Sequence, residues 1–265
     1  MSSPREAADP PRRPPDREAV VWVAEQRRLF QRVLDALGRG HIPFAVAGAF
    51  AFQHYTGIAR DTKDLDLFLP AVEIGAALEG CRAAGLETEI TDPVWLAKVR
   101  AGEYYVDLIT GMSNGVYWVT PEWVERARRG PVLEGSYPLL APEEMILSKI
   151  FVTRRERFDG ADICHLVYCC GRELDWPRLL REVGEQTPML LWHLLLFQYV
   201  YPAAVDRVPR AVWRQLRREQ QAGLEHPPAG GFRGSLVDPL QFAADVQEWG
   251  LENREDELRR RRLRA

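Results

Sequence analysis

The sequence predicts an α/β domain followed by a domain of helices. Through about residue 140, short apolar runs alternate with segments of helical periodicity, which is typical of a sheet covered by helices. After Pro142, apolar residues recur at helical spacing and the connections between segments are short. The length of 265 residues and the hydrophobic content of 46% suffice for cores that need no disulfide or metal to fold.

The first eighteen residues contain five prolines among charged residues, and residues 1–18 are therefore expected to be disordered. The α/β domain is expected over residues 19–140. Apolar residues at every third or fourth position predict its helices, and short apolar or alternating runs predict its strands. In order, these elements are a helix at 19–37, a strand at 43–47, a helix at 49–55, a strand at 64–69, a helix at 71–84 and a strand at 104–110.

Residues 141–250 are expected to form the helical domain, with a loop rich in Gly and Pro at 223–234. Its expected helices lie at 143–152, 159–169, 177–183, 188–200, 209–221 and 239–249. The remaining residues, 251–265, form a tail with four acids and six arginines. This composition predicts a charged helix, and we favour a solvated helix over one that contacts nucleic acid.

Composition excludes several classes of protein. A net charge of −3 gives no electrostatic reason to expect nucleic-acid binding. The most apolar run, residues 189–201, is too short to span a bilayer and predicts a buried helix. No secretory signal opens the sequence and the four cysteines lack the spacing of a zinc knuckle, so we expect reduced thiols in a cytoplasmic protein.

Lysine is scarce in this sequence. Only Lys63, Lys98 and Lys149 are lysines, although the chain has 35 basic residues. A GC-rich coding genome explains such an excess of arginine. Because lysine is rare here, a lysine beside a motif is nevertheless a candidate functional residue.

The strongest chemical signal is a pair of aspartates on the second predicted strand. Residues i and i+2 of a strand project to the same face, so Asp64 and Asp66 lie together while the leucines between and after them enter the core. Adjacent carboxylates repel unless a cation neutralises them, and Mg²⁺ or Mn²⁺ takes carboxylate oxygens. Asp107, on the third predicted strand, would supply a third carboxylate. An exposed acidic strand end is the alternative interpretation.

Residues near the acids are candidates for nucleotide binding. Gly48 and Ala49 stand at a predicted strand-to-helix junction, where backbone N–H groups and the positive helix end attract phosphates. A glycine at such a turn is also explained by its conformation alone. Arg60, Thr62 and Lys63 directly precede the acids, where phosphate binding and neutralisation of the carboxylates are equally open roles.

A further candidate is Lys149, on the first helix expected in the helical domain. Its ammonium is predicted to contact a triphosphate or, alternatively, to be exposed to solvent. Three arginines and two acids, Asp159 and Asp162, follow it. A salt-bridge network explains these charges at least as well as substrate binding does.

Residues 47–67 resemble the polymerase-β-type nucleotidyltransferase superfamily, and its small bacterial members most. These carry G-[GS] and then R-x-T-x-D-h-D-h, a pattern matched by Gly48, Arg60, Thr62, Asp64 and Asp66. Asp107 resembles the family's third acid, and residues 141–166 more loosely resemble the helices of its second domain. Ala49 departs from the pattern because its side chain has no hydroxyl to hold phosphate.

The resemblance implies a nucleotidyltransferase-like mixed sheet with flanking helices and an NTP substrate such as ATP. It also implies that Asp64 and Asp66 bind two divalent metals, that Asp107 binds one of them, and that Gly48 lies against the phosphates. Two functions remain open. The first is a metal-dependent nucleotidyltransferase that moves a nucleoside monophosphate from an NTP to an acceptor hydroxyl on a small molecule, an RNA or a protein. The second is a nucleotide-binding or regulatory module without turnover, such as a toxin–antitoxin component, which Ala49 favours.

Overall fold

The computed structural model describes residues 23–226 and 231–264, so the segment expected to be disordered, 1–18, lies outside the described residues. The chain divides into two compact units. The described part of the sheet unit comprises residues 23–144 and 255–264, and that of the helical unit comprises residues 145–226 and 231–254.

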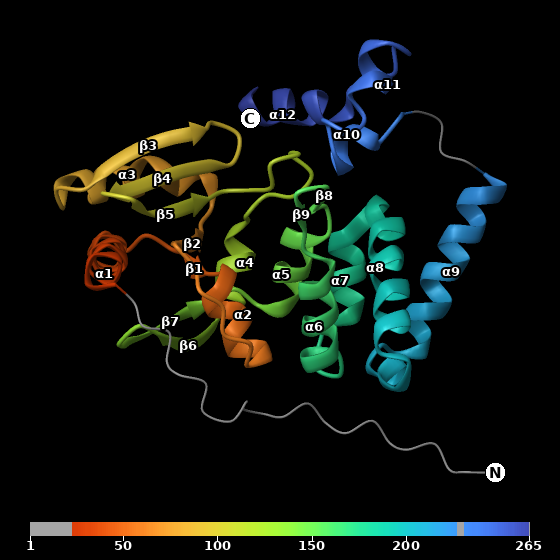
Figure 1. Ribbon diagram of the computed structural model, residues 1–265, viewed down its shortest axis with the longest axis horizontal. Helices are drawn as coiled ribbons and strands as arrows, with labels where there is room; N and C mark the ends of the chain where they lie inside the picture. The colour runs from red at the N-terminus through yellow and green to blue at the C-terminus, as the bar shows by residue number, and fades with distance from the viewer. Residues whose placement is uncertain (1–22, 227–230, 265) are drawn as a thin grey trace. The chain divides into compact units, whose positions relative to one another are not determined.

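The sheet unit contains a mixed seven-stranded sheet with the strand order β3-β4-β5-β2-β1-β7-β6 (Figure 1). β2 pairs with β5 and β1 with β7 in parallel, and all other neighbours in this sheet are antiparallel. The strands are β1 (Ala45–Val46), β2 (Asp64–Phe68), β3 (Glu87–Asp92), β4 (Leu96–Ala101), β5 (Tyr104–Ile109), β6 (Arg128–Val132) and β7 (Gly135–Leu139). The predicted α/β class is therefore confirmed.

The three strands predicted from the sequence are present as β1, β2 and β5, and the sheet contains four more. β3 and β6 are the two edge strands, and most side chains of β3 are exposed. β6 contains Gly130 and Pro131, which the hydrophobic pattern of a strand does not include. Edge strands need little apolar surface, because one side of their backbone faces away from the sheet. The search for apolar runs therefore found β1, β2 and β5 and missed both edge strands. It also missed β4 and β7, which lie inside the sheet.

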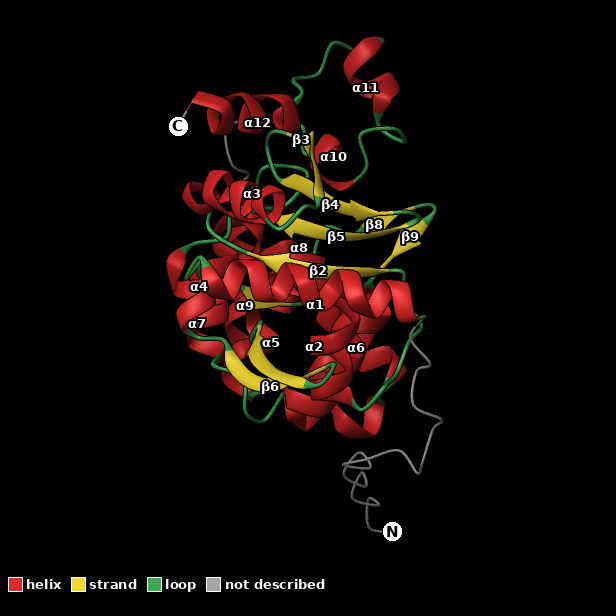
Figure 2. Cartoon of the chain, turned by 90° about the vertical axis from the view of Figure 1, so that its left-hand side faces the viewer, coloured by secondary structure: helices red, strands yellow, loops and turns green. Residues whose placement is uncertain are grey.

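Helix α1 (Ala24–Arg39) packs against β4, β5 and helix α3 (Ile74–Ala83), and Figure 2 shows α1 running across the sheet. The buried side chains of α1 recur at helical spacing, as the sequence predicts. Leu65 and Leu67 of β2 are fully buried. Because side chains alternate along a strand, the aspartates of β2 project from the opposite face of the sheet. Two further helices of this unit are α2 (Gly48–Thr56) and α4 (Pro121–Glu125).

The helical unit is organised around α8, which contacts α6, α7 and α9. Leu190, Leu194 and Phe197 of α8 are fully buried, whereas Trp192, Leu195 and Tyr199 are exposed. The prediction of a buried helix at 189–201 is therefore confirmed for one face only. The helices are α5 (Pro142–Lys149), which leads into the unit, α6 (Gly160–Cys170), α7 (Trp176–Val183), α8 (Thr187–Val200), α9 (Arg210–Glu225), α10 (Gly234–Val237) and α11 (Ala243–Gln247). A small hairpin of β8 (Thr153–Arg154) and β9 (Arg157–Phe158), which the sequence pattern does not show, connects α5 to α6.

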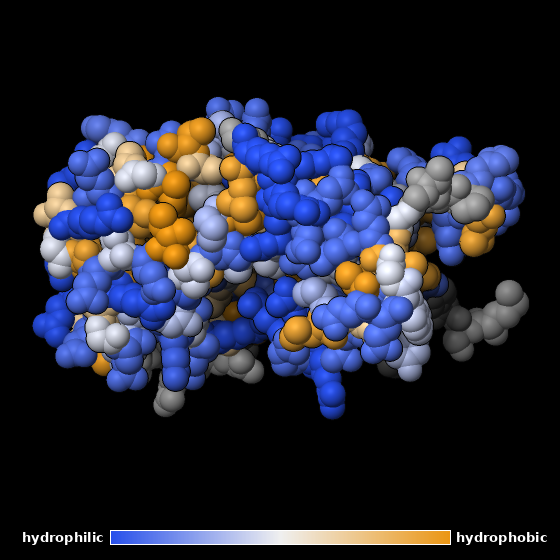
Figure 3. All heavy atoms as spheres, turned by 90° about the horizontal axis from the view of Figure 1, so that it is seen from above, coloured by the Kyte–Doolittle hydropathy of each residue, from blue (hydrophilic) through white to orange (hydrophobic). Residues whose placement is uncertain are grey.

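The C-terminal segment differs from the solvated helix expected over 251–265. Residues 254–264 form helix α12 (Arg254–Arg264), and residues 255–264 belong to the sheet unit. Arg259 donates hydrogen bonds to both carboxylate oxygens of Asp92, at 2.8 and 3.1 Å, and another to the carbonyl of Ser113. The Arg262 guanidinium lies 4.3 Å from the ring centroid of Trp118. Viewed from the side of α12, the surface has a hydrophilic band across its centre (Figure 3).

No helix in the described part of the chain is long and apolar enough to cross a bilayer. The four cysteines are free thiols, with Cys81 in α3 and the others in α6. Burial raises the pKa of both Cys81 and Cys164 to about 11, so these thiols stay protonated at neutral pH. Cys170 is also buried, whereas Cys169 is half-buried.

Candidate active site

Three aspartates meet on the polar face of the central strands. The parallel register of β2 and β5 places Asp66 opposite Asp107 and Asp64 opposite Tyr105. One carboxylate oxygen from each of Asp64, Asp66 and Asp107 lies within 4.8 Å of the others, and all three residues are half-buried. An exposed acidic strand end, the alternative considered from the sequence, does not describe this cluster.

The strand beside β5 brings a lysine to the same cluster. Lys98 of β4 is the cross-strand partner of Asp107, and its Nζ lies 2.6 Å from Asp107 Oδ1. The same Nζ lies 3.8 Å from the ring centroid of Tyr105. Sequence reasoning missed this residue, because its place depends on the register between two strands of which only one was predicted. The scarcity of lysine was the signal that could have drawn attention to it.

The electrostatics of the cluster reflect both burial and this ion pair. Burial raises the pKa of Asp107 above its ordinary value, while Lys98 partly offsets that increase and the charge of Asp64 adds to it. Burial also raises the pKa of Tyr105, and the nearby carboxylates, first Asp64, raise it further. The face therefore concentrates negative charge, and the Lys98 ammonium lies within it.

Thr62 orients the first acid. Its hydroxyl donates a short hydrogen bond to Oδ1 of Asp64, and its backbone carbonyl accepts a hydrogen bond of 2.7 Å from Gln26 Nε2 of α1. Lys63, the next residue, is exposed. The exposed Arg60 guanidinium lies over the Phe52 ring, 4.3 Å from its centroid. The Thr62 side chain therefore lies directly on a carboxylate of the cluster.

Gly48 is required at its position by two features of the site. Its φ of +52° is in the left-handed region, and a Cβ there would lie 1.8 Å from Asp66 Oδ2. The chain is held close to Asp66 because the backbone N–H of Ala47 donates a 2.9 Å hydrogen bond to the carbonyl of Asp66. Helix α2 begins at Gly48, with Ala49 half-buried in its first turn. The start of α2 is therefore packed directly against an acid of the cluster.

Lys149 belongs to the helical unit. It is not exposed to solvent, which was the alternative to a triphosphate contact considered from the sequence. Its Nζ lies 2.6 Å from Asp159 Oδ2 and 2.9 Å from Asp162 Oδ2, and its side chain is only 12% exposed. Arg157 also pairs with Asp159, at 3.2 Å. Burial acts to raise the pKa of Asp159, but Lys149 and Arg157 together lower it below its ordinary value. These contacts form the salt-bridge network that the sequence also allowed.

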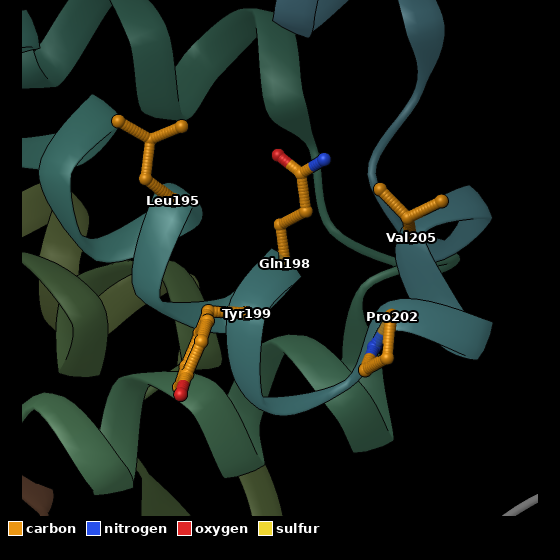
Figure 4. Close-up of a pocket in the computed structure, with 5 residues that line it drawn as sticks. All are labelled: Leu195, Gln198, Tyr199, Pro202 and Val205. Atoms are coloured by element: carbon orange, nitrogen blue, oxygen red, sulfur yellow. The ribbon is translucent and has the colours of Figure 1, made fainter.

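A separate hollow lies in the helical unit, where it is lined by residues of α8 and of the short helical segment that follows. Its volume is about 440 Å³, and Figure 4 shows the lining side chains Leu195, Gln198, Tyr199, Pro202 and Val205. The lining contains no charged side chain, so it offers none of the chemistry found at the acidic cluster.

No family model matches the sequence, and no curated protein matches it either. Comparison with solved structures does find similar chains. They include ANT(2'')-Ia in complex with adenylyl-2''-tobramycin, which is 15% identical over 66% of this chain and 98% of that chain, with a TM-score of 0.42. The lincosamide antibiotic adenylyltransferase LnuA, bound to lincomycin, is 17% identical over 54% of this chain and 96% of that chain, with a TM-score of 0.39.

A third similar structure is an antigenic nucleotidyltransferase-like protein from Paracoccidioides brasiliensis. It is 17% identical over 64% of this chain and 92% of that chain, with a TM-score of 0.36. All three are nucleotidyltransferases or nucleotidyltransferase-like proteins.

Proposed function

We propose that this chain is a metal-dependent nucleotidyltransferase, which transfers a nucleoside monophosphate from an NTP to the hydroxyl of an acceptor. The observation that carries the proposal is the β2–β5 register, which gathers three carboxylates from two strands on one face of the sheet. Like charges so close are unfavourable unless a cation shares them. Such a cluster is therefore expected where a protein binds a divalent metal and a phosphate substrate.

The donor set fits Mg²⁺ or Mn²⁺. Asp64, Asp66 and Asp107 would hold the metal, because their oxygens are hard ligands and lie within 4.8 Å of one another. When bound, the metal would neutralise charge on the phosphates and stabilise the leaving oxygen. The three side chains are partly buried, which strengthens their interaction with a cation relative to exposed acids.

The residues of the chain then position the substrates. The start of α2 lies against Asp66, so phosphates held at the cluster would also meet backbone N–H groups at a helix N-terminus. The missing side chain of Gly48 leaves room for the Asp66 carboxylate against the start of this helix. In the transfer, an acceptor oxygen bonds to the α-phosphorus and the bond from that phosphorus to pyrophosphate breaks. Asp107 would accept the proton that the acceptor hydroxyl releases.

The test is transfer of label from α-labelled NTPs in the presence of Mg²⁺. The acceptors would include total RNA, cell lysate, tobramycin and lincomycin. The double variant Asp64→Asn/Asp66→Asn should abolish transfer. The matched control, Glu87→Gln/Glu89→Gln, removes two carboxylates from edge strand β3 and should transfer as the wild type does. Wild-type transfer by the Asp64→Asn/Asp66→Asn protein would show that the assignment is wrong.

A nucleotide-binding module without turnover is the second candidate, and Ala49 is the observation that favours it. An alanine in the first turn of α2 supplies no hydroxyl to a phosphate. Calorimetry with Mg²⁺ and each NTP separates the two candidates. Binding without pyrophosphate release across all acceptors would favour the module, whereas pyrophosphate release that depends on an acceptor would exclude it.

A further inference from the structure

The acidic cluster has a resident cation of its own. Lys98 Nζ lies 2.6 Å from Asp107 Oδ1, and the two side chains are 15% and 14% exposed. Glu89 is also a cross-strand partner of Lys98, but Oε2 of Glu89 lies 3.0 Å from Arg100 Nε. The Lys98 ammonium therefore contacts Asp107, whereas Glu89 contacts Arg100.

The type of side chain at this position is informative in a chain with three lysines. An ammonium is a compact charge on a flexible four-carbon stem, whereas a guanidinium is a planar group that holds a carboxylate through two parallel hydrogen bonds. An ammonium therefore resembles a metal ion more closely than a guanidinium does, because both the ammonium and the metal ion are compact charges that can neutralise a single carboxylate oxygen. The ring of Tyr105, with its centroid 3.8 Å from the ammonium, offers a second favourable contact if Nζ moves away from Asp107.

We propose that Lys98 occupies the position of a second cation in the nucleotide-free protein. The chain then binds one divalent ion at Asp64 and Asp66, and Asp107 becomes available to a second ion only when Lys98 moves from it. This inference rests on the proposed function, since it assumes that the cluster binds metal. Lys98 is a positioning residue here, because it acts through Asp107 and not on the substrate.

The contacts of the cluster support this division. The Lys98 ammonium already neutralises charge at Asp107, at 2.6 Å from Oδ1. A second divalent ion without nucleotide would have to compete with Lys98 for an oxygen that the lysine already contacts. In the transfer, the triphosphate supplies the negative charge that a second ion requires.

The experiment counts bound Mn²⁺ per chain without nucleotide, by calorimetry and by the loss of the free Mn²⁺ signal in electron paramagnetic resonance. We expect one ion for the wild type and two for Lys98→Met. Lys98→Arg keeps the charge and should bind one. Arg39→Met, which removes a positive charge from the exposed last turn of α1, is the matched control and should also bind one.

Two ions in the wild type, or one in folded Lys98→Met, would overturn the role of Lys98 while leaving the proposed function intact. No Mn²⁺ bound by the wild type would overturn both. If Lys98→Met unfolds without metal because its carboxylates repel, unfolding is followed with Mn²⁺ present. Refolding with two ions would support the inference, and failure to refold would count against it. Lys98→Met/Asp107→Asn lacks both charges and should bind one ion, whereas two would contradict the inference.

Discussion

Replacing Gly48 by alanine tests how closely the start of α2 is fitted to the acidic cluster. The added Cβ would lie 1.8 Å from Oδ2, 2.9 Å from Cγ and 3.2 Å from Cβ of Asp66. A real Cβ does not approach an oxygen so closely, so the carboxylate must rotate or the backbone must shift. Ala47 limits the shift, because its N–H is hydrogen-bonded to the Asp66 carbonyl.

The expected cost has three parts. A left-handed backbone costs a residue with a Cβ about 1–2 kcal/mol. Moving Asp66 from its preferred rotamer costs about 0.5–1.5 kcal/mol more. Alanine restricts the unfolded chain, which returns about 0.4–1 kcal/mol. Gly48→Ala should therefore lower the free energy of unfolding by about 0.5–3 kcal/mol and also displace a carboxylate that we propose binds metal.

Urea denaturation measures the first effect and Mn²⁺ titration measures the second. The matched control is Gly38→Ala, because Gly38 lies within α1 and a Cβ there would meet nothing within 4 Å. Alanine in a helix interior is favoured over glycine, so this control should be more stable by up to about 1 kcal/mol and should bind Mn²⁺ like the wild type.

The reasoning would be refuted by a Gly48→Ala protein with wild-type stability and wild-type Mn²⁺ affinity. Such a result would mean that Asp66 can move at no cost and is not needed where the structure places it. Lower stability with unchanged Mn²⁺ affinity would be a partial refutation. It would confirm the backbone strain but contradict the role of the Asp66 oxygens.

Three further predictions concern ion pairs outside the acidic cluster. Lys149→Met leaves two buried carboxylates without their ammonium and should lower the free energy of unfolding in urea by about 3–5 kcal/mol. Because the pKa of Asp159 is lowered on folding, this residue stabilises the protein above its unfolded pKa of about 3.9, and that contribution is lost as the pH falls further. Asp159→Asn should therefore make unfolding less dependent on pH below about 4, and an unchanged acid profile would contradict the pairing. Arg259→Met should release α12, seen as faster amide hydrogen exchange in residues 255–264, whereas unchanged protection would show that the Asp92 contact does not hold the helix.

The acidic cluster could be predicted from the sequence because a strand has a fixed period of two. Asp64 and Asp66 must share a face once the segment is a strand, and the leucines that alternate with them make the strand recognisable. Asp107 stands in an apolar run of the same kind, so a sheet that includes both strands has a good chance of joining them. Most of this prediction therefore followed from the alternation of acidic and apolar residues along each strand.

The partners of the charged side chains could not be predicted in the same way. Lys98 meets Asp107 only because β4 and β5 pair in one register, and Arg259 meets Asp92 across 167 positions of sequence. Charged residues satisfy any strand or helix pattern, so the pattern does not choose among possible partners. The expectation of a solvated tail followed from composition alone, and composition does not indicate that Arg259 pairs with the half-buried Asp92.

The scarcity of lysine acquires a physical interpretation from these pairings. Two of the three lysines, Lys98 and Lys149, have mostly buried ammonium groups on aspartates, and Lys63 directly precedes Asp64. A base composition that favours arginine would replace lysine wherever either cation serves equally well. Lys98 and Lys149 are positions where a compact charge fits, since each ammonium contacts carboxylates through its single nitrogen.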